Sequence, residues 1–249
     1  MGVALITGAS SGVGREMARR LHQRGNEIVI TARSADALEE LAVELGGAQV
    51  VVADLGQPEG VDAVVAAVER VDLLVNSAGF GDYGPFVKAE RPRVRGMVEL
   101  NCAALAELTR AYLPSMVERH AGQVLNIAST AAFQAGPEMA VYCATKAFVL
   151  SFSEAIAEEV RGTGVTVTAF CPGAFSSGFQ DAARSGNSKL FRDRKLPSSE
   201  EMADAALEAL DHKKVVSVPG AFNKIGAFMP RLTPRPVLRR AVHFVQREA

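Results

Sequence analysis

Tyr142 and Lys146 are the residues of this chain whose types and spacing most clearly suggest chemistry. They are four positions apart, so on a helix the phenol and the ammonium lie on one face. A phenol titrates near pH ~10 in water, too high to exchange protons at neutral pH. A neighbouring ammonium stabilises the phenolate and lowers that pKa, so the pair can protonate or deprotonate a substrate oxygen. Most pairs at this spacing are surface neighbours, so a catalytic role needs support from other residues.

Ser129 offers such support. It comes thirteen positions before Tyr142 and follows an apolar run at residues 123–127 that we predict to be a strand. Its hydroxyl could hold the same substrate oxygen. The structural alternative is a serine that caps the next turn, as many serines after strands do. Cys143 points elsewhere on the predicted helix, and we interpret it as a small packing residue.

A glycine-rich segment lies close to the amino terminus, directly after the apolar run at residues 3–6. A strand, a glycine turn and a helix in this order can cradle a dinucleotide pyrophosphate, because the glycines let the backbone approach the phosphates and the helix offers free N–H groups. Glycine turns also occur for steric reasons alone, so the motif by itself leaves both interpretations open. The residues that we predict to bind the cofactor here are Gly8, Ser10, Ser11, Gly12, Val13 and Gly14.

The end of the second predicted strand bears on the choice of cofactor. Proteins that prefer NAD usually place an acidic side chain there for the ribose 2′-hydroxyl. Here the chain reads Thr31-Ala32-Arg33, and Arg33 could form a charge-assisted pair with a 2′-phosphate. The alternative is a solvated loop cation. We therefore predict NADP(H) as the cofactor, with NAD(H) as the other possibility.

Two further segments after strands could contact the cofactor. Asp54 could accept a hydrogen bond from the adenine amino group, with Leu55 beside it. It could also cap the next turn, and the two roles are compatible. The small residues of the segment 76–79 permit close approach to a flat ligand, or they simply make a tight turn. From this segment we predict that Asn76, Ala78 and Gly79 bind the cofactor.

Apolar, β-branched runs alternate with helical stretches along the whole chain. This alternation predicts an α/β fold, a Rossmann-type doubly wound parallel sheet of about seven strands with helices on both faces. Thr7, Asn76, Ser129 and Pro172 each follow a strand, so they should meet at the carboxyl edge of the sheet. The predicted strands are 3–6, 27–31, 49–53, 72–76, 123–127, 165–170 and 215–218; the predicted helices are 14–24, 34–45, 61–68, 92–113, 141–161 and one capped by Ser198 that ends near 211.

Composition narrows the class of protein. The chain has 249 residues, 48% of them hydrophobic, with a net charge of −1. This predicts one domain over 1–249 and gives no sign of a nucleic-acid partner. The three cysteines lack metal-ligand spacing, so we expect no metal and a reducing cytoplasm. We expect neither a signal peptide nor a run of the ~18 apolar residues that a membrane span needs.

Taken together, the motifs resemble the short-chain dehydrogenase/reductase family over roughly residues 1–220. The likeness rests on five motifs in family order: Thr7-Gly8-x-x-x-Gly12-x-Gly14, Asn76-Ser77-Ala78-Gly79, Ser129, Tyr142-x-x-x-Lys146 and Pro172-Gly173. Each motif is weak alone, and five in register are specific. Ser77 departs from the family's usual asparagine, and Ser177 stands where the family often has threonine.

The resemblance implies a set of roles. NADPH gives a hydride to a carbonyl carbon, Tyr142 gives a proton to its oxygen, and Ser129 positions that oxygen. Lys146 lowers the Tyr142 pKa and binds the nicotinamide ribose, so Tyr142 and Lys146 also count as cofactor-binding. Asn101 is implied as the fourth catalytic residue, which disturbs its helix and holds a water that connects Lys146 to solvent. Pro172, Gly173 and Ser177 are implied to contact the nicotinamide side of the cofactor.

The leading hypothesis is an NADP(H)-dependent oxidoreductase that acts on a small carbonyl compound or secondary alcohol. A non-catalytic dinucleotide sensor is the alternative, and a redox-assisted lyase or epimerase is a third possibility. Family members are usually oligomers, which implies a homodimer or homotetramer. We expect the loops 80–86, 131–140 and 176–197 to determine the substrate, with 176–197 as the main substrate loop.

The stretch 220–249 is a basic carboxyl-terminal extension. Its prolines predict a loosely structured approach to a final helix with one apolar face. We expect this face to dock on the core of the chain itself or on a sister subunit, and a membrane surface is the less favoured alternative. The residues of the apolar face are Val237, Leu238, Ala241, Val242 and Val245, and the basic ones are Arg231, Arg235, Arg239, Arg240, His243 and Arg247.

Overall fold

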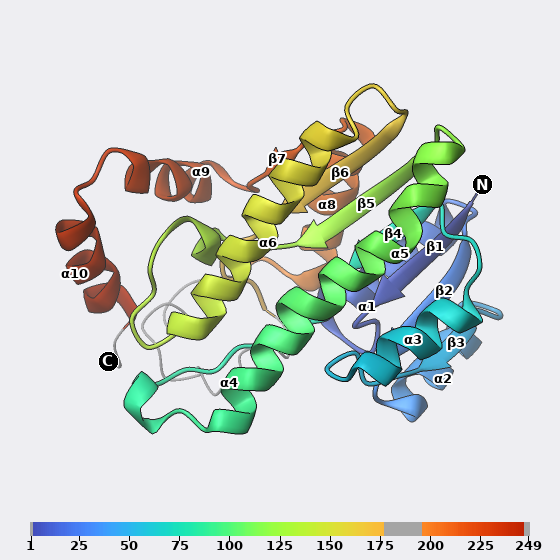
Figure 1. Cartoon of the computed structure of the whole chain (residues 1–249), viewed down its shortest axis with the longest axis horizontal. Helices are drawn as coiled ribbons and strands as arrows, with labels where there is room; N and C mark the ends of the chain where they lie inside the picture. Colours follow the sequence, from blue (N-terminus) through green and yellow to red (C-terminus); the bar gives the residue numbers. More distant parts are fainter. Residues whose placement is uncertain (1, 177–195, 247–249) are drawn as a thin grey trace.

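Seven parallel strands form one sheet in the order β3-β2-β1-β4-β5-β6-β7 (Figure 1). The structure is a computed structural model, which describes residues 2–176 and 196–246. The strand order turns back between β1 and β4, and ligands bind at such a switch point in doubly wound sheets. The predicted α/β fold is therefore confirmed. The strands are β1 (Val3–Thr7), β2 (Glu27–Ala32), β3 (Gln49–Val52), β4 (Leu73–Asn76), β5 (Gly122–Ile127), β6 (Val165–Phe170) and β7 (Val216–Ser217).

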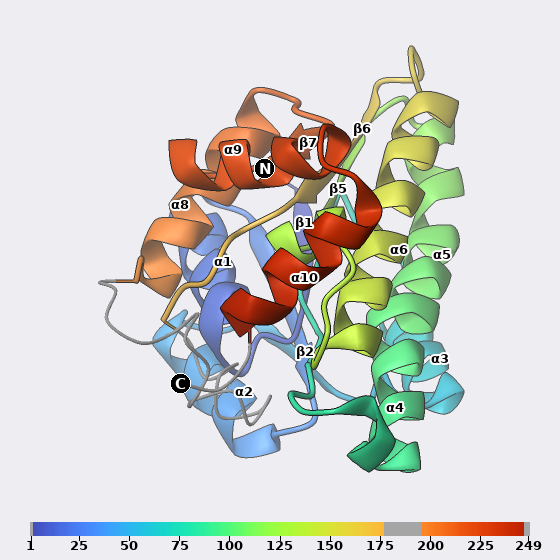
Figure 2. The same cartoon turned by 90° about the vertical axis from the view of Figure 1, so that its left-hand side faces the viewer.

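Helices cover both faces of the sheet because successive strand residues point to opposite sides. In β1, Ile6 belongs to the core beneath α1 (Gly12–Gln23), α2 (Ala35–Glu44) and α8 (Ser199–Asp211). Leu5 belongs to the core beneath α3 (Pro58–Ala67) and α5 (Leu105–Glu118). The long helix α6 (Ala140–Glu159) lies beside α5 on this second face (Figure 2). The two cores hold the strand ends in fixed register.

The helix predicted over residues 92–113 consists of three pieces. α4 (Arg91–Val98) is followed by a π-helical segment η2 (Glu99–Ala104), and α5 continues past Pro114 to Glu118. The extra residue in the π segment changes which side chains face the sheet. Asn101 lies in this segment and is 1% exposed. A single regular helix over 92–113 is therefore wrong, whereas the disturbance implied at Asn101 is present and puts its amide group inside the protein.

Shorter elements complete the described chain. The 3-10 turns are η1 (Phe86–Lys88), η3 (Thr130–Phe133) and η4 (Met229–Arg231). At the start of α8, Ser198 Oγ accepts a hydrogen bond from Glu201 N, and Glu201 Oε2 accepts one from Ser198 N, which is the predicted capping box. α6 is long and apolar enough to count as a candidate membrane span by length and composition, contrary to our expectation. Its inner face packs on the sheet beside β6, as in a core helix, so it is no clear transmembrane segment.

The carboxyl-terminal extension differs most from expectation. Its approach is helical, with α9 (Ala221–Phe228) and η4 leading to α10 (Arg235–Gln246). Both helices lie beyond the carboxyl edge of the sheet (Figures 1 and 2). The expected docking of the α10 apolar face on the chain's own core holds only in part, because Leu238 and Val242 are half-buried whereas Val237 is 57% and Val245 is 49% exposed. The alternative, docking on a sister subunit, stays a prediction.

Candidate active site

The glycine loop between β1 and α1 has a shape that side chains would block. Gly8 has φ +68°, and a Cβ there would lie 2.8 Å from Ala78 Cα. A Cβ on Gly14 would lie 2.5 Å from the Gly8 carbonyl oxygen. Ser11 caps α1 without using its hydroxyl, and the first turn of α1 has no acidic residue. The amino end of α1 therefore fits the pyrophosphate of a dinucleotide.

Thr7 fastens the segment after β4 against this loop. Its Oγ1 accepts hydrogen bonds from the backbone N–H groups of Ser77 and Ala78, both at 3.0 Å. The same hydroxyl donates to the Val75 carbonyl at 3.4 Å. Gly79 follows, and a Cβ there would lie 3.0 Å from Asn101 Oδ1. The small residues of the segment are therefore required by close packing.

The residues predicted to bind the adenosine half take different places. Arg33 follows β2, is exposed, and has no ion-pair partner in the described part of the chain. Asp54 Oδ1 accepts a hydrogen bond from Gly56 N at 3.1 Å, so Asp54 does cap its turn. Leu55 is 5% exposed and belongs to the core under α3. Arg33 is thus the available cation at this edge.

Asn76 lies at the end of β4, but its side chain is buried. Its Nδ2 donates to Asn126 Oδ1 at 2.9 Å and to Thr109 Oγ1 at 3.2 Å. Asn126 in turn donates to Ser153 Oγ at 2.9 Å. This chain of polar groups joins β4, β5, α5 and α6 and holds the floor of the site in place. The cofactor role of Asn76 stays a prediction.

Ser129, Tyr142 and Lys146 come together at the carboxyl ends of β5 and β6. The Ser129 hydroxyl hydrogen-bonds Tyr142, and it also accepts a hydrogen bond from Ala131 N at 3.1 Å. The Lys146 ammonium lies 5.8 Å from the centre of the Tyr142 ring and donates to the Ile127 carbonyl at 2.6 Å. Tyr142 and Lys146 are 9% and 7% exposed. Ser129 thus serves both as a turn cap and as a neighbour of the phenol.

Asn101 braces this cluster from the π-helical segment. Its Oδ1 accepts a hydrogen bond from Phe80 N at 3.1 Å, and its Nδ2 donates to the Phe80 carbonyl at 2.9 Å. The same Nδ2 donates to Thr145 Oγ1 at 3.0 Å, and Thr145 donates to the Tyr142 carbonyl at 2.8 Å. Asn101 therefore ties the segment after β4 to the helix that carries the phenol. A water held by Asn101 stays a prediction.

Burial dominates the electrostatics of the cluster. It lowers the pKa of Lys146 to about 8, because the charged ammonium is removed from water. It also raises the pKa of Tyr142 above its ordinary value, and the hydrogen bond from Ser129 offsets this only in part. The expected lowering of the Tyr142 pKa by Lys146 is therefore wrong for the cofactor-free chain. A phenol that stays protonated at neutral pH is suited to donate a proton.

The segment after β6 closes the site. The Pro172 carbonyl accepts a hydrogen bond from Thr130 N at 2.9 Å, which joins it to η3. A Cβ on Gly173 would lie 2.6 Å from Asn223 Oδ1, so α9 packs directly over this glycine. Ser177 and most of the predicted substrate loop 176–197 lie outside the described residues.

Sequence reasoning missed two supporting residues, Thr145 and Asn223. Thr145 lies three positions after Tyr142, and a hydroxyl at that spacing on a helix is able to hydrogen-bond the backbone carbonyl of Tyr142. No pattern indicated Asn223, because it comes from the extension. Phe80 and Tyr83 pack with Tyr142 and Met139 in one cluster, which agrees with a substrate role for the loop 80–86. Among the described residues, no group of three or more metal-ligating side chains is present.

Comparisons with known proteins agree with this geometry. The family model for short chain dehydrogenases matches residues 2–188. An uncharacterised oxidoreductase of Staphylococcus epidermidis is 31% identical over 87% of this chain and 94% of its own length. A short-chain dehydrogenase from Sphingobium yanoikuyae, solved in complex with NADPH, is 31% identical with a TM-score of 0.84, over 93% of this chain and 95% of that one. The bulky-bulky ketone specific alcohol dehydrogenase from Comamonas testosteroni is 29% identical with a TM-score of 0.80, over 93% and 92%.

Proposed function

This chain belongs to the short-chain dehydrogenase family, and on that premise we propose that it is an NADP(H)-dependent oxidoreductase for a carbonyl compound or secondary alcohol. The observation that carries the proposal is the buried contact of three groups. Ser129 hydrogen-bonds the Tyr142 phenol, and the Lys146 ammonium lies 5.8 Å from the centre of the same ring. These are the groups that proton transfer to a carbonyl oxygen requires.

Each residue of the site has its own role in the proposed reaction. The bound nicotinamide supplies or accepts the hydride. Ser129 holds the substrate oxygen, and Tyr142 donates its proton to that oxygen. The positive charge of Lys146 stabilises the phenolate that remains, and its ammonium would also hold the nicotinamide ribose. Asn101 and Thr145 position this part of α6. In the oxidation of an alcohol, Tyr142 accepts the proton instead.

The cofactor choice rests on two features of this chain. Close packing of Gly8 and Gly14 against backbone atoms fixes the glycine loop at the amino end of α1, whose free N–H groups suit a pyrophosphate. Arg33 has no carboxylate partner in the described part of the chain, so its guanidinium is available for a 2′-phosphate. The Sphingobium relative was solved with NADPH, which supports the same choice.

The remaining proposals rest on family likeness. We propose a small carbonyl or alcohol substrate, a homodimer or homotetramer, and a cytoplasmic location. The relatives are named as dehydrogenases and oxidoreductases, so the sensor hypothesis gains no support from them. No described residue of the site favours a lyase or epimerase.

The test is a pair of matched substitutions. Tyr142→Phe removes the phenolic hydroxyl at the site and should lower NADPH-dependent ketone reduction by about a thousandfold, within the range of general acid catalysis. Tyr112→Phe makes the same change on α5, where the hydroxyl donates to the Val64 carbonyl, and should leave turnover within about twofold. Near-wild-type reduction by Tyr142→Phe would refute the mechanism. Tight NADPH binding with no turnover of any ketone would favour the sensor.

A further inference from the structure

The carboxyl-terminal extension concentrates the exposed apolar side chains of the protein. Among the described residues, sixteen large apolar side chains are exposed, and eight of them lie between residues 222 and 245. The other eight are spread over residues 43–215. Single exposed apolar side chains are ordinary on a protein surface, whereas a concentration of them marks an interaction site. The extension is therefore a candidate interaction surface, and its chemistry indicates the partner.

α9 packs on the rest of the chain through its small residues. Ala227 is 7% exposed, and Asn223 lies over Gly173, where a Cβ would come within 2.6 Å of its Oδ1. The large apolar residues of α9 and η4 follow one another at helical spacing on the opposite side and are between 47% and 72% exposed. This arrangement reverses the usual one, in which the large apolar residues are buried. The residues of this stripe are Phe222, Ile225, Phe228, Met229 and Leu232.

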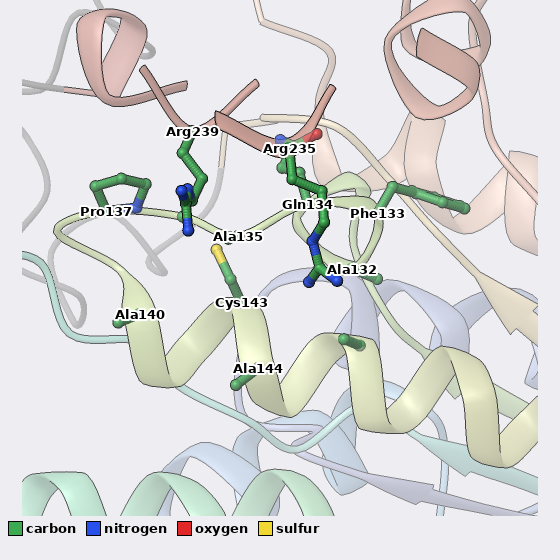
Figure 3. Close-up of a pocket in the computed structure, with 12 residues that line it drawn as sticks. Ala132, Phe133, Gln134, Ala135, Pro137, Ala140, Cys143, Ala144, Arg235 and Arg239 are labelled. Atoms are coloured by element: carbon green, nitrogen blue, oxygen red, sulfur yellow. The ribbon is translucent and has the colours of Figure 1, made fainter. Parts of the chain in front are cut away.

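α10 adds a second apolar face to the same side of the molecule. Its inner side lies over a pocket of about 390 Å³ that η3 and α6 line from below, with Arg235 and Arg239 at the top (Figure 3). Leu238 and Val242 are half-buried on this side. α9 and α10 lie together in front of the sheet edge (Figure 2). The exposed apolar residues on the other side of α10 are Val237, Ala241 and Phe244.

The charges of the extension have one sign. Residues 212–247 contain no Asp or Glu, although the whole chain has a net charge of −1. Lys224 in α9, Arg231 in η4 and Arg240 on the outer face of α10 are all exposed. Cations of this kind bind lipid phosphates while apolar side chains beside them enter the layer between the headgroups and the acyl chains. The cytoplasmic leaflet is anionic, so it complements both properties of this surface.

A sister subunit, the partner expected from the sequence, fits this surface less well. The commonest contact between two copies has a two-fold axis and joins the same patch on both. Such a contact would bring Arg231 and Arg240 of one copy toward the same cations of the other, and residues 212–247 offer no carboxylate to neutralise them. Burial of unpaired like charges is costly. Anionic lipid headgroups supply the negative charge that the extension lacks.

We propose that the extension docks on the surface of an anionic lipid bilayer. The apolar stripe of α9 and η4 and the outer face of α10 enter the headgroup layer, and Lys224, Arg231 and Arg240 bind lipid phosphates. α9 also packs on η3 and on Gly173, so docking holds the candidate active site close to the membrane surface. The contact is peripheral, and it does not depend on the proposed reaction.

Vesicle binding tests the proposal. The full chain is mixed with vesicles of phosphatidylcholine, with and without about 30% phosphatidylserine, and the bound fraction is measured by co-sedimentation at about 0.1 M salt. Binding to the anionic vesicles should be about tenfold tighter than to the neutral ones. It should weaken about tenfold at about 0.5 M salt, because salt screens the attraction between cations and headgroups. Equal binding to both kinds of vesicle, or binding to neither, would overturn the proposal.

Matched substitutions locate the surface. Ile225→Ser removes apolar area and Arg231→Glu places an anion against the phosphates, so each should weaken binding to the anionic vesicles about tenfold. Val43→Ser on α2 and Arg161→Glu just after α6 are similar changes at exposed positions away from the extension, and binding should stay within about twofold. Thermal unfolding checks that all four variants fold. Equal weakening by the control variants would show that another surface binds the lipid.

Sedimentation velocity separates a lipid partner from a second copy. The wild-type chain and Ile225→Ser should form particles of the same mass at every concentration, because the extension contacts lipid and not another copy. A lower mass for Ile225→Ser, together with no vesicle binding by the wild-type chain, would assign the surface to a sister subunit and refute lipid docking.

Discussion

α1 and α10 are both amphipathic helices of twelve residues, yet only α1 buries its apolar face fully. α1 buries Met17 and Leu21 against the sheet, at 0% and 3% exposure. α10 exposes Val237 and directs Arg235 and Arg239 into a pocket. α1 is tied to β1 and β2 at its two ends, so covering the sheet is the only way to bury its apolar face. α10 follows the last strand and lies beyond the sheet edge.

The difference shows the limit of hydrophobic patterning as a predictor. The pattern indicates which face of a helix is apolar, whereas the loops that connect the helix determine which part of the protein can cover that face. In the sheet-anchored part of the chain, the pattern and the connections agree, and the candidate catalytic groups are built there. In the extension they disagree, so α10 leaves Val237 and Phe244 exposed and only half-buries Leu238 and Val242.

The largest effect should come from a change in the sheet-anchored part. Ser129→Ala should lower kcat for every ketone by about a hundredfold to a thousandfold, as expected for the loss of one hydrogen bond to the reacting oxygen. Arg240→Gln in the extension changes an exposed side chain and should leave kcat within about twofold. Steady-state kinetics on a panel of ketones make the comparison. Ser115→Ala, whose hydroxyl donates to the Tyr112 carbonyl on α5, is the control. Near-wild-type turnover by Ser129→Ala would break the contrast.

A smaller difference is expected when substitutions in α1 and α10 are compared by their effect on the free energy of unfolding. Met17→Ala leaves a cavity in the core and should lower the free energy of unfolding by about 2–4 kcal/mol. Val237→Ala changes an exposed side chain and should cost no more than about 0.5 kcal/mol. Urea titration at low and high protein concentration measures both. A large cost for Val237→Ala that appears only at high concentration would mean that a second copy covers the α10 face.

The two regions should also differ in cofactor selectivity. Arg33→Asp should raise the KM for NADPH by about tenfold to a hundredfold, because it replaces a cation near the 2′-phosphate with an anion. The KM for NADH should change by no more than about twofold. Arg240→Asp makes the same charge change on α10 and should alter neither value. Equal losses for NADPH and NADH in Arg33→Asp would show that Arg33 is a surface cation.

The smallest predicted effect is the pH dependence of Lys146. Burial lowers its pKa from 10.5 to about 8, so the ammonium is present below pH 8 and is lost above it. If the charged form supports the reaction, kcat/KM for NADPH should fall about tenfold between pH 7 and pH 9, since kcat/KM reports the groups of the free enzyme. Lys146→Met should be slower and should lack this step. A rate that rises through pH 8 would contradict the assignment.

Much of this could be predicted from the sequence, for physical reasons. The apolar runs and the capping box of Ser198 and Glu201 are local signals, so the strands and α8 were predicted within a few residues. The glycine loop was found because only glycine permits its backbone contacts. The meeting of Ser129 with Tyr142 follows from the rule that parallel strands end at one edge.

Other features depend on contacts that the sequence does not display. The resemblance implied that Asn101 disturbs its helix, but its hydrogen bonds to Phe80 and Thr145, which are distant in the sequence, come only from the fold. The direction of the Tyr142 pKa shift depends on burial, which outweighs the charge of Lys146. The placement of α10 depends on how α9 and η4 lead to it from the sheet. In each case the competing effect comes from tertiary packing.

Transfer of isotope from the cofactor tests the central claim most directly. The chain is incubated with a ketone and NADPH labelled with deuterium at C4 of the nicotinamide, prepared as each of the two C4 epimers. The account predicts that one epimer places deuterium on the carbinol carbon of the product alcohol, at a rate that falls about a thousandfold in Tyr142→Phe and stays unchanged in Tyr112→Phe. An alcohol without deuterium from either epimer, or full labelling by Tyr142→Phe, would contradict it.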